Sequence, residues 1–249
     1  MIGARALSGP GYAGQVMLGA RSVVALLGVS ALGCASEARS CDLDTDAIVM
    51  WATVTDLGDA VEVEVEFEAA GVEGIGLSLC PDRDRLAING VEPSVLRALE
   101  HVVYVAEFDG ASTGEYEIAL QRTDAQSVSV TVELPPSIEV LSPALDSTHS
   151  RAAPLEVSWD PPWSGQMIDL AVEDQVGSDC IDALAIGYQV EDTGSYTIGA
   201  HSLVSATGGS CEVTLALTRS VAVEYPSELH EGGQIAGFVR RRQPFISSD

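Results

Sequence analysis

Val61-Glu62-Val63-Glu64-Val65-Glu66-Phe67 is the stretch that decides the fold of this chain. Four apolar residues alternate with three glutamates, so an extended backbone places the apolar side chains on one face and the carboxylates on the other. A helix would mix the two sets around its axis. The segment therefore predicts a half-buried β-strand, and the rest of the chain repeats its period of two.

Further segments before residue 135 show the same alternation, with apolar side chains at every second position. Asn89-Gly90 predicts a tight hairpin, because both residues tolerate the positive φ that such a turn requires. Ser94–Glu100 follows Pro93, and it is the one segment for which we expect a helix, of one or two turns. The further predicted strands contain Tyr104, Ala106 and Phe108, then Tyr116, Ile118 and Leu120, then Val128, Val130, Val132 and Leu134.

Pro135-Pro136 separates this series from a second one, because proline cannot donate to a sheet and stiffens a connection. The motif T-G-x-Y-x-I occurs once on each side, at 113–118 and at 193–198. We therefore expect two β domains, 41–135 and 136–249, each of ordinary domain size. The candidate strands of the second series are Ile138–Leu141, Leu155–Trp159, Ile168–Val172, Tyr196–Ile198, Cys211–Leu217 and Gln234–Val239.

The second half also resembles a known family. Leu155-Glu156-Val157-Ser158-Trp159-Asp160-Pro161-Pro162 is similar to an early core strand and the following loop of fibronectin type III and related immunoglobulin-like domains, over about 136–245. This resemblance implies an all-β fold, which we expect as two tandem immunoglobulin-like β-sandwich domains. The segment from Cys211 to Arg242 also resembles a group of uncharacterised exported proteins of GC-rich Gram-negative bacteria, and that group implies no activity.

The N-terminal segment predicts export. The apolar run Val23–Leu32 follows Arg21 and ends just before Cys34, and it is about half the ~20 residues that a membrane span needs. The segment resembles the type II signal peptides of bacterial lipoproteins. An ordinary secretory signal with a coincidental cysteine is the alternative.

The resemblance to lipoproteins implies that residues 1–33 are a signal peptide and that Cys34 is the lipid anchor. Residues 34–40 would then be a lipidated tether, and the charged and apolar series that begins at Met17 suggests that Met17 is the true start. The expected location is the cell envelope, at the outer membrane or the cell surface. The expected partners are a membrane, through the lipid, and an envelope protein or polysaccharide.

Five cysteines are an odd number, and assigning Cys34 to lipid leaves four. Exported chains meet an oxidising compartment in which disulfides form, and four cysteines allow three pairings. Pairing within each expected domain gives Cys41–Cys80 and Cys180–Cys211. No C-x-x-C occurs and the histidines are scattered, so we expect no metal site of the zinc type.

The charge of the chain excludes nucleic acid as a partner. The formal net charge is −25, and the only run of basic residues is Arg240-Arg241-Arg242. Binding to phosphate backbones depends on clustered lysine and arginine. The acidity keeps the surface solvated and repels other anionic surfaces.

Two letter patterns invite a catalytic or metal interpretation. Gly110-Ala111-Ser112-Thr113-Gly114 matches G-x-S-x-G, but the nucleophile elbow needs a helix after the serine, where we expect a strand. Asp42, Asp44 and Asp46 have the spacing of a calcium loop, yet Ala47 stands where the EF-hand pattern requires glycine. The sequence leaves open whether a calcium ion binds in these loops, and we expect no cofactor.

Three tryptophans complete the set of candidate residues. Trp51 and Trp159 lie within apolar alternation, so we expect both in the core. Trp163 follows two prolines in a loop, where its indole either packs across the loop or contacts a ligand such as a sugar ring. We therefore expect a non-enzymatic binding or structural protein, carbohydrate-binding or adhesive in its most specific form. The alternative is an envelope hydrolase or an accessory domain of an enzyme.

Overall fold

The computed structural model describes residues 38–71, 76–98, 101–110, 114–174, 180–181, 185–205 and 208–249. This part of the chain is all β, apart from two short 3-10 turns, Ser40–Asp42 and Thr45–Ala47. The strands of the first half are β1 (Ala38–Arg39), β2 (Ile48–Asp56), β3 (Ala60–Ala69), β4 (Leu77–Ser78), β5 (Asp84–Ile88), β6 (Ser94–Ala98), β7 (His101–Asp109), β8 (Glu115–Arg122) and β9 (Val128–Glu133). Those of the second half are β10 (Glu139–Ser142), β11 (Thr148–Ser150), β12 (Leu155–Asp160), β13 (Met167–Asp174), β14 (Ala185–Glu191), β15 (Ser195–Ile198), β16 (Cys211–Ala222) and β17 (Gln234–Ser248).

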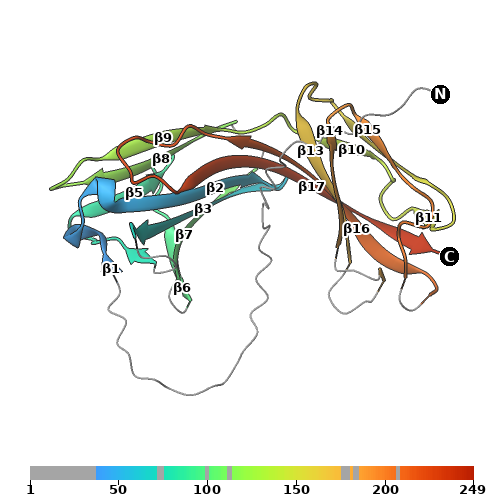
Figure 1. The fold of residues 1–249 in the computed structure, drawn as a ribbon, viewed down its shortest axis with the longest axis horizontal. Helices are drawn as coiled ribbons and strands as arrows, with labels where there is room; N and C mark the ends of the chain where they lie inside the picture. The colour runs from blue at the N-terminus through green and yellow to red at the C-terminus, as the bar shows by residue number, and fades with distance from the viewer. Residues whose placement is uncertain are drawn as a thin grey trace, which may run out of the picture. The chain divides into compact units, whose positions relative to one another are not determined.

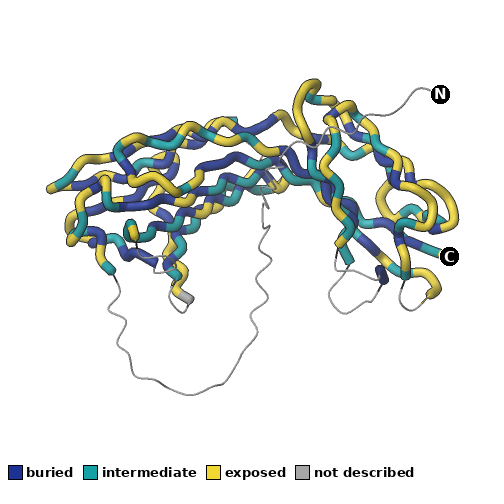
Figure 2. The backbone as a smooth tube through the Cα atoms, viewed as in Figure 1, coloured by how far each residue is buried: buried dark blue, intermediate teal, exposed yellow. Residues whose placement is uncertain are grey.

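The first half is a sandwich in which β2-β3-β7-β6 form one sheet and β5-β8-β9 the other. Apart from the short β1 and β4, this four-plus-three order is the one that constant-type immunoglobulin domains use. The apolar residues of the opening stretch, Val61, Val63, Val65 and Phe67, are each 0% exposed in β3, as the alternation predicts. Figure 2 shows buried and more exposed residues alternating along the long strands.

The second half is a sandwich in which β10-β12-β15 form one sheet and β14-β13-β16-β17 the other. Here the fourth main strand in chain order, β14, has joined the opposite sheet, which is the arrangement of fibronectin type III-like domains. Val157 of β12, Leu170 of β13 and Leu215 of β16 are at most 1% exposed, so both sheets contribute to its core. The expected all-β, immunoglobulin-like sandwich fold is confirmed.

Strand β17 belongs to both halves. Residues Ala236–Ser247 pair antiparallel with β16, and Gln234–Val239 also pair in parallel with Trp51–Asp56 of β2. The sheet β14-β13-β16-β17 of the second sandwich and the sheet β2-β3-β7-β6 of the first are thereby continuous (Figure 1), and β11, which pairs with β17, is the ninth strand of this sheet. The pairing of β17 with β2 joins the two halves that the boundary predicted at Pro135-Pro136 would separate, and the division into independently folding domains 41–135 and 136–249 stays a prediction.

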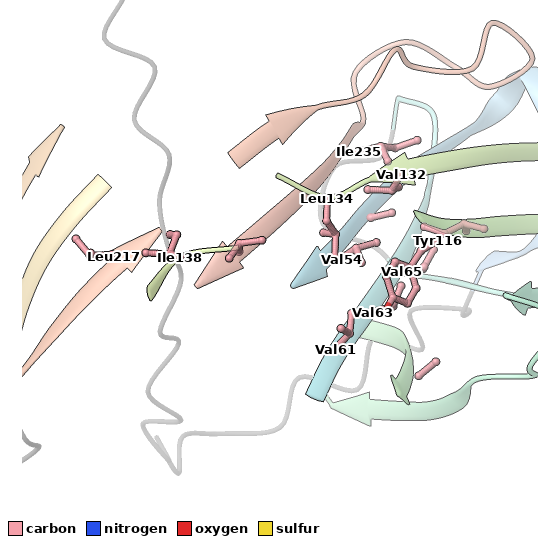
Figure 3. Close-up of a cluster of buried hydrophobic side chains, with 14 of the residues drawn as sticks. Val54, Val61, Val63, Val65, Tyr116, Val132, Leu134, Ile138, Leu217 and Ile235 are labelled. Carbon is pink, nitrogen blue, oxygen red and sulfur yellow. The ribbon is translucent and has the colours of Figure 1, made fainter. Parts of the chain in front are cut away.

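Residues Arg219–Val239, which we call the β16–β17 arm, complete the core of the first sandwich. Figure 3 shows Ile235 of the arm beside Val132 and Leu134, and Ile235 is 1% exposed. The Tyr225 hydroxyl accepts a hydrogen bond of 2.8 Å from the Met50 N–H. Gly237 is closely packed: a Cβ there would lie 3.1 Å from Val132 and 3.2 Å from the Glu133 carbonyl oxygen, so these neighbours would have to shift by a few tenths of an ångström.

Two expectations about local structure in the first half are wrong. Ser94–Ala98 of the expected helix 94–100 is strand β6, paired with β7 from Ser94↔Val105 to Ala98↔His101, and residues 99–100 lie outside the described part. Pairing with β7 outweighs the weak local helix preference. The described end of the expected tether, 38–40, is folded instead of free, since Ala38 pairs with Leu77 and Ser40 is 0% exposed.

The Asn89-Gly90 turn is confirmed. Asn89 has φ 48° and Gly90 has φ 77°, and Ile88 and Val91 exchange backbone hydrogen bonds of 2.8 and 2.9 Å across the turn. In the first copy of the T-G-x-Y-x-I motif, the ring centroids of Tyr116 and Phe108 lie 5.5 Å apart. In the second copy, those of Tyr196 and Tyr188 lie 5.4 Å apart. Each motif tyrosine thus packs on an aromatic ring eight positions earlier in the sequence.

Candidate functional site

The loop between β12 and β13 carries Trp163, the ligand contact suggested by the sequence. Pro161 and Pro162 lack backbone donors, so β12 cannot continue past Asp160. Gly165, at φ 82°, and a hydrogen bond of 3.1 Å from Gln166 N to Trp163 O turn the chain back toward β13. Trp163 is half-buried, Pro161 and Pro162 are exposed, and Met167 is 46% exposed.

A buried ion pair lies beneath this loop. Arg219 of β16 and Asp192, just after β14, are both 0% exposed, and Arg219 Nε lies 2.6 Å from Asp192 Oδ2. The Trp159 indole donates to Asp192 Oδ1 at 2.7 Å, and the backbone N–H of Trp163 also donates to this carboxylate. Asp192 therefore joins the strand that precedes the loop to the loop itself.

Arg219 uses its remaining donors to hold backbone carbonyls. Its Nη1 donates to Pro136 O and Ser137 O, both at 3.0 Å, and its Nη2 donates to Pro161 O at 2.5 Å. A buried guanidinium is stable only when its charge is paired and its N–H groups are hydrogen-bonded. The same side chain thus fixes the start of the Trp163 loop and the connection between the two halves.

Burial raises the pKa of Asp192, but hydrogen bonds from Arg219, from the Trp159 indole and from the Trp163 backbone outweigh burial and lower the pKa below its usual value. The carboxylate is ionised at neutral pH. It is enclosed by its donors, so it serves to position the loop. The loop exposes proline, tryptophan and methionine surface, which suits binding by contact and stacking.

The structure corrects the assignment of one tryptophan. Trp159 is 2% exposed and belongs to the core, as expected, whereas Trp51 is 40% exposed. In β2, Met50 and Ala52 point inward, so the side chain of Trp51 lies on the outer face of the sheet. The sequence did not show which side chains of this strand face inward, because residues 48–52 are five apolar residues in a row and do not alternate with polar ones.

The cysteines pair as the sequence predicts. Cys41–Cys80 has an S–S distance of 2.08 Å and Cys180–Cys211 one of 1.93 Å. Cys34 and the signal segment 1–33 lie outside the described residues, so their assignment stays a prediction. Within the described part of the chain, no helix is long and apolar enough to cross a membrane.

The acidic stretch near the first disulfide lies at a small polar pocket. Asp42 and Asp44 line a small polar pocket together with Arg83 and Asp124, and Arg83 lies 3.6 Å from Asp124. Among the described residues, no group of three or more histidine, cysteine, aspartate or glutamate side chains is arranged to hold a metal ion. A nearby arginine also opposes cation binding at this pocket.

The G-x-S-x-G letters do not form a nucleophile elbow. Residues 111–113 lie outside the described part, but Gly114 is followed at once by strand β8, which begins at Glu115. The elbow requires a helix in this place. The surroundings of the motif are therefore those of a connection between two strands.

Sequence reasoning missed the buried ion pairs, of which Arg122–Asp84 is the second, with both side chains 2% exposed. Arg122 Nη2 donates to the carbonyl oxygens of Ser40 at 2.6 Å and Leu43 at 2.9 Å, and these two hydrogen bonds hold residues 40–43 against β8. The sequence contains a signal for both buried arginines. Arg122 follows Ile118 and Leu120 in the inward phase of β8, and Arg219 follows Leu215 and Leu217 in that of β16.

No protein-family model and no curated protein matches the chain. Among solved structures, it is similar to the fibronectin(III)-like modules of Clostridium thermocellum CbhA, with 12% identity over 78% of this chain and 94% of that one, at a TM-score of 0.23. The DIP-gamma IG1+IG2 structure has 8% identity over 84% of this chain and 99% of that one, at a TM-score of 0.22. A chimeric titin Z1Z2 tandem has 11% identity over 78% and 96%, at a TM-score of 0.20. These scores are low, so the fold assignment rests on the strand orders described above.

Proposed function

We propose that the protein is a lipid-anchored component of a bacterial cell envelope, at the outer membrane or the cell surface, with a non-enzymatic binding or structural role. The observation that carries the proposal is the use of the cysteines. The four cysteines after the signal segment are paired in two disulfides, which leaves Cys34 as the fifth. Disulfides persist in oxidising compartments, so their presence supports export.

The position of β1 adds a geometric consequence. If Cys34 carries lipid, only residues 35–37 separate it from β1, which begins at Ala38. The step from Cys34 to Ala38 can span at most about 14 Å, since an extended chain advances ~3.5 Å per residue. The end of the first sandwich that holds β1 would therefore stay close to the membrane, and the acidic 42–46 segment would stay there with it.

Fatty-acid labelling tests the anchor. In a Gram-negative host fed an alkyne-labelled fatty acid, we expect the full chain to incorporate label and Cys34→Ala to lose it. The double variant Cys41→Ala/Cys80→Ala removes two other cysteines and is expected to remain labelled. Label on the Cys34→Ala protein would show that the anchor assignment is wrong.

We further propose that the Trp163 loop is the binding surface, and that it takes a carbohydrate or an adhesive partner in the envelope. The loop is held from below by Asp192 and Arg219, so it is ordered before it meets a ligand. A half-buried indole beside exposed prolines offers a flat apolar surface of the kind on which a sugar ring stacks. Ordering in advance reduces the entropy lost on binding.

Binding to an array of neutral oligosaccharides tests the loop. We expect Trp163→Ala to weaken any saturable binding by about tenfold, since stacking and burial of one aromatic ring supply up to a few kcal/mol. Trp51→Ala removes an equally large side chain from a different surface and is the matched control. Absence of binding on the array, or binding that Trp163→Ala leaves unchanged, would contradict the assignment.

A further inference from the structure

The outer face of the sheet β2-β3-β7-β6 carries side chains that the core does not use. The register aligns Trp51 of β2 with Glu66 of β3, Glu66 with Val103 of β7, and Val103 with Leu96 of β6. Trp51 is 40% exposed and Leu96 is 58% exposed. Residues paired in this way share one face of a sheet, so the four side chains form one row across four strands. This face is distant in sequence from the Trp163 loop.

A second row lies beside the first. Thr53 is aligned with Glu64, Glu64 with Val105, and Val105 with Ser94. Thr53, Val105 and Val103 are only partly buried. The two rows thus combine an exposed aromatic ring with aliphatic surface. An exposed indole bordered by aliphatic side chains marks a surface that gains from being covered.

The charges on this face are of one sign. Glu62, Glu64 and Glu66 point outward from β3, and burial, followed by repulsion from Glu62 and Glu66, raises the pKa of Glu64. The sequences of these four strands contain one arginine, Arg97, whose register partner is the buried Val102 and whose Nη1 donates to Ser78 at 2.8 Å. His101 lies 3.7 Å from Glu66. A cationic partner would relieve the repulsion within the glutamate row.

The spacing of the carboxylates indicates the form of such a partner. Successive outward residues of a strand lie about 6.6–6.8 Å apart, because each residue advances ~3.3–3.4 Å. An extended polypeptide with a basic residue at every second position repeats over the same distance. Its cations can therefore meet Glu62, Glu64 and Glu66 in register, and an arginine at its end can lie over the ring of Trp51.

We propose that the outer face of β2-β3-β7-β6 docks an extended, arginine-rich segment of a partner protein, with the glutamate row pairing its cations and Trp51 stacking on a guanidinium. The site is separate from the Trp163 loop, so it adds a protein partner to the proposed envelope role. A face of this kind distinguishes partner segments both by their charge and by the spacing of their basic residues. It does not depend on the lipid anchor.

The test uses a fluorescein-labelled octapeptide with arginine at alternate positions, titrated with the purified protein while anisotropy is measured at about 0.15 M salt, where the Debye length is about 8 Å. We expect saturable binding that Trp51→Ala and the double variant Glu64→Gln/Glu66→Gln each weaken by about tenfold, since cation–π contacts and desolvated charge pairs contribute energies of this size. The intrinsic fluorescence of the wild-type protein should change on binding, and that of Trp51→Ala should not.

Three controls distinguish a site from general attraction to an acidic protein. Glu139→Gln/Glu191→Gln removes the same charge from exposed positions of the second sandwich, and we expect less than about a twofold effect, since exposed charges more than a Debye length away are screened. Trp163→Ala should leave the affinity unchanged. A peptide of the same composition with its arginines adjacent should bind more weakly.

Several results would overturn the proposal. Equal weakening by both glutamate double variants would indicate diffuse attraction. Equal affinity for the two peptides, or for the small polycation spermine, would remove the role of spacing. Saturable binding of a neutral oligosaccharide that Trp51→Ala abolishes, without peptide binding, would make the face a sugar platform instead. The glutamine variants lose repulsion, so their folding is expected to be intact, and thermal unfolding of each variant verifies it.

Discussion

Asp192 and Arg219 show how single buried side chains position a surface loop. The pair is fully buried, and such a pair gains stability only when every partner is present. Here the carboxylate receives the Arg219 guanidinium, the Trp159 indole and a backbone N–H, while the guanidinium also holds three carbonyl oxygens. These contacts hold the Trp163 loop in place, which is what the proposed binding role requires of it.

Asp192→Asn tests this role. The substitution keeps the shape but leaves the Arg219 charge buried without a counter-charge, so we expect a loss of about 3–5 kcal/mol in the free energy of unfolding. Urea unfolding at pH 7, followed by tryptophan fluorescence, measures it. Asp59→Asn, in the exposed turn between β2 and β3, is the control and should change the stability by less than about 0.5 kcal/mol. A variant as stable as the control would show that the pair is dispensable.

The same residue predicts a pH dependence. The pKa of Asp192 is lower in the folded protein than its usual value, so its stabilisation is fully present above that usual value and is lost as the pH falls through the folded-state pKa. Wild-type stability should therefore decline below about pH 4, where unfolded aspartates take up protons. The difference in the free energy of unfolding between wild type and Asp192→Asn should become smaller over that pH range. A difference in unfolding free energy that stays constant down to about pH 2 would contradict this prediction.

At the scale of elements, the sequence predicts strands well where one side of the strand is polar. The alternation of β3 gives both its type and its faces, because each glutamate marks the outer face. The β2 segment fails this test, since its apolar run does not show that Trp51 is outward. Strand β6 fails for another reason: its pairing with β7 is a tertiary contact that local preference does not contain.

The β16–β17 arm shows the limit of periodicity. The sequence identifies both strands of the arm by their alternation, yet nothing local states that Gln234–Val239 lies beside β2. Gly237 reflects the packing of β17 against β9, because a Cβ there would lie only 3.1 Å from Val132 and 3.2 Å from the Glu133 carbonyl oxygen. A glycine within an otherwise regular strand is a signal of close backbone approach. It does not identify the neighbour.

At the scale of the whole molecule, two disulfides link parts of the described chain that are far apart in sequence. The disulfides join cysteines 39 and 31 positions apart, and each can stabilise the chain by about 3–4 kcal/mol in the chain-entropy model. The arrangement of the cysteines was predictable from their number and the proposed boundary. The docking face proposed around Trp51 was not, because it depends on four strands being aligned in register.

The arm makes a prediction about the two halves as a unit. If residues 38–135 and 136–249 are co-expressed as separate chains, we expect them to remain associated. The reason is that β17 pairs with β2 along six residues, and the arm adds the buried Ile235 and the Tyr225–Met50 hydrogen bond. Leaving the β2 edge open would expose both apolar surface and unpaired backbone groups.

Capture through a tag on the second chain measures the association, and circular dichroism of each half alone shows whether it folds without the other. Gly237→Val is the matched variant, because its side chain would enter the space occupied by Val132 and the Glu133 carbonyl and force β17 away from β9. We expect it to reduce recovery of the first half strongly. Two folded halves that separate freely would establish independent domains at Pro135-Pro136 and would show that the β2–β17 pairing contributes little. Retention that Gly237→Val abolishes would instead make the arm an integral strand of the first sandwich, supplied by the second.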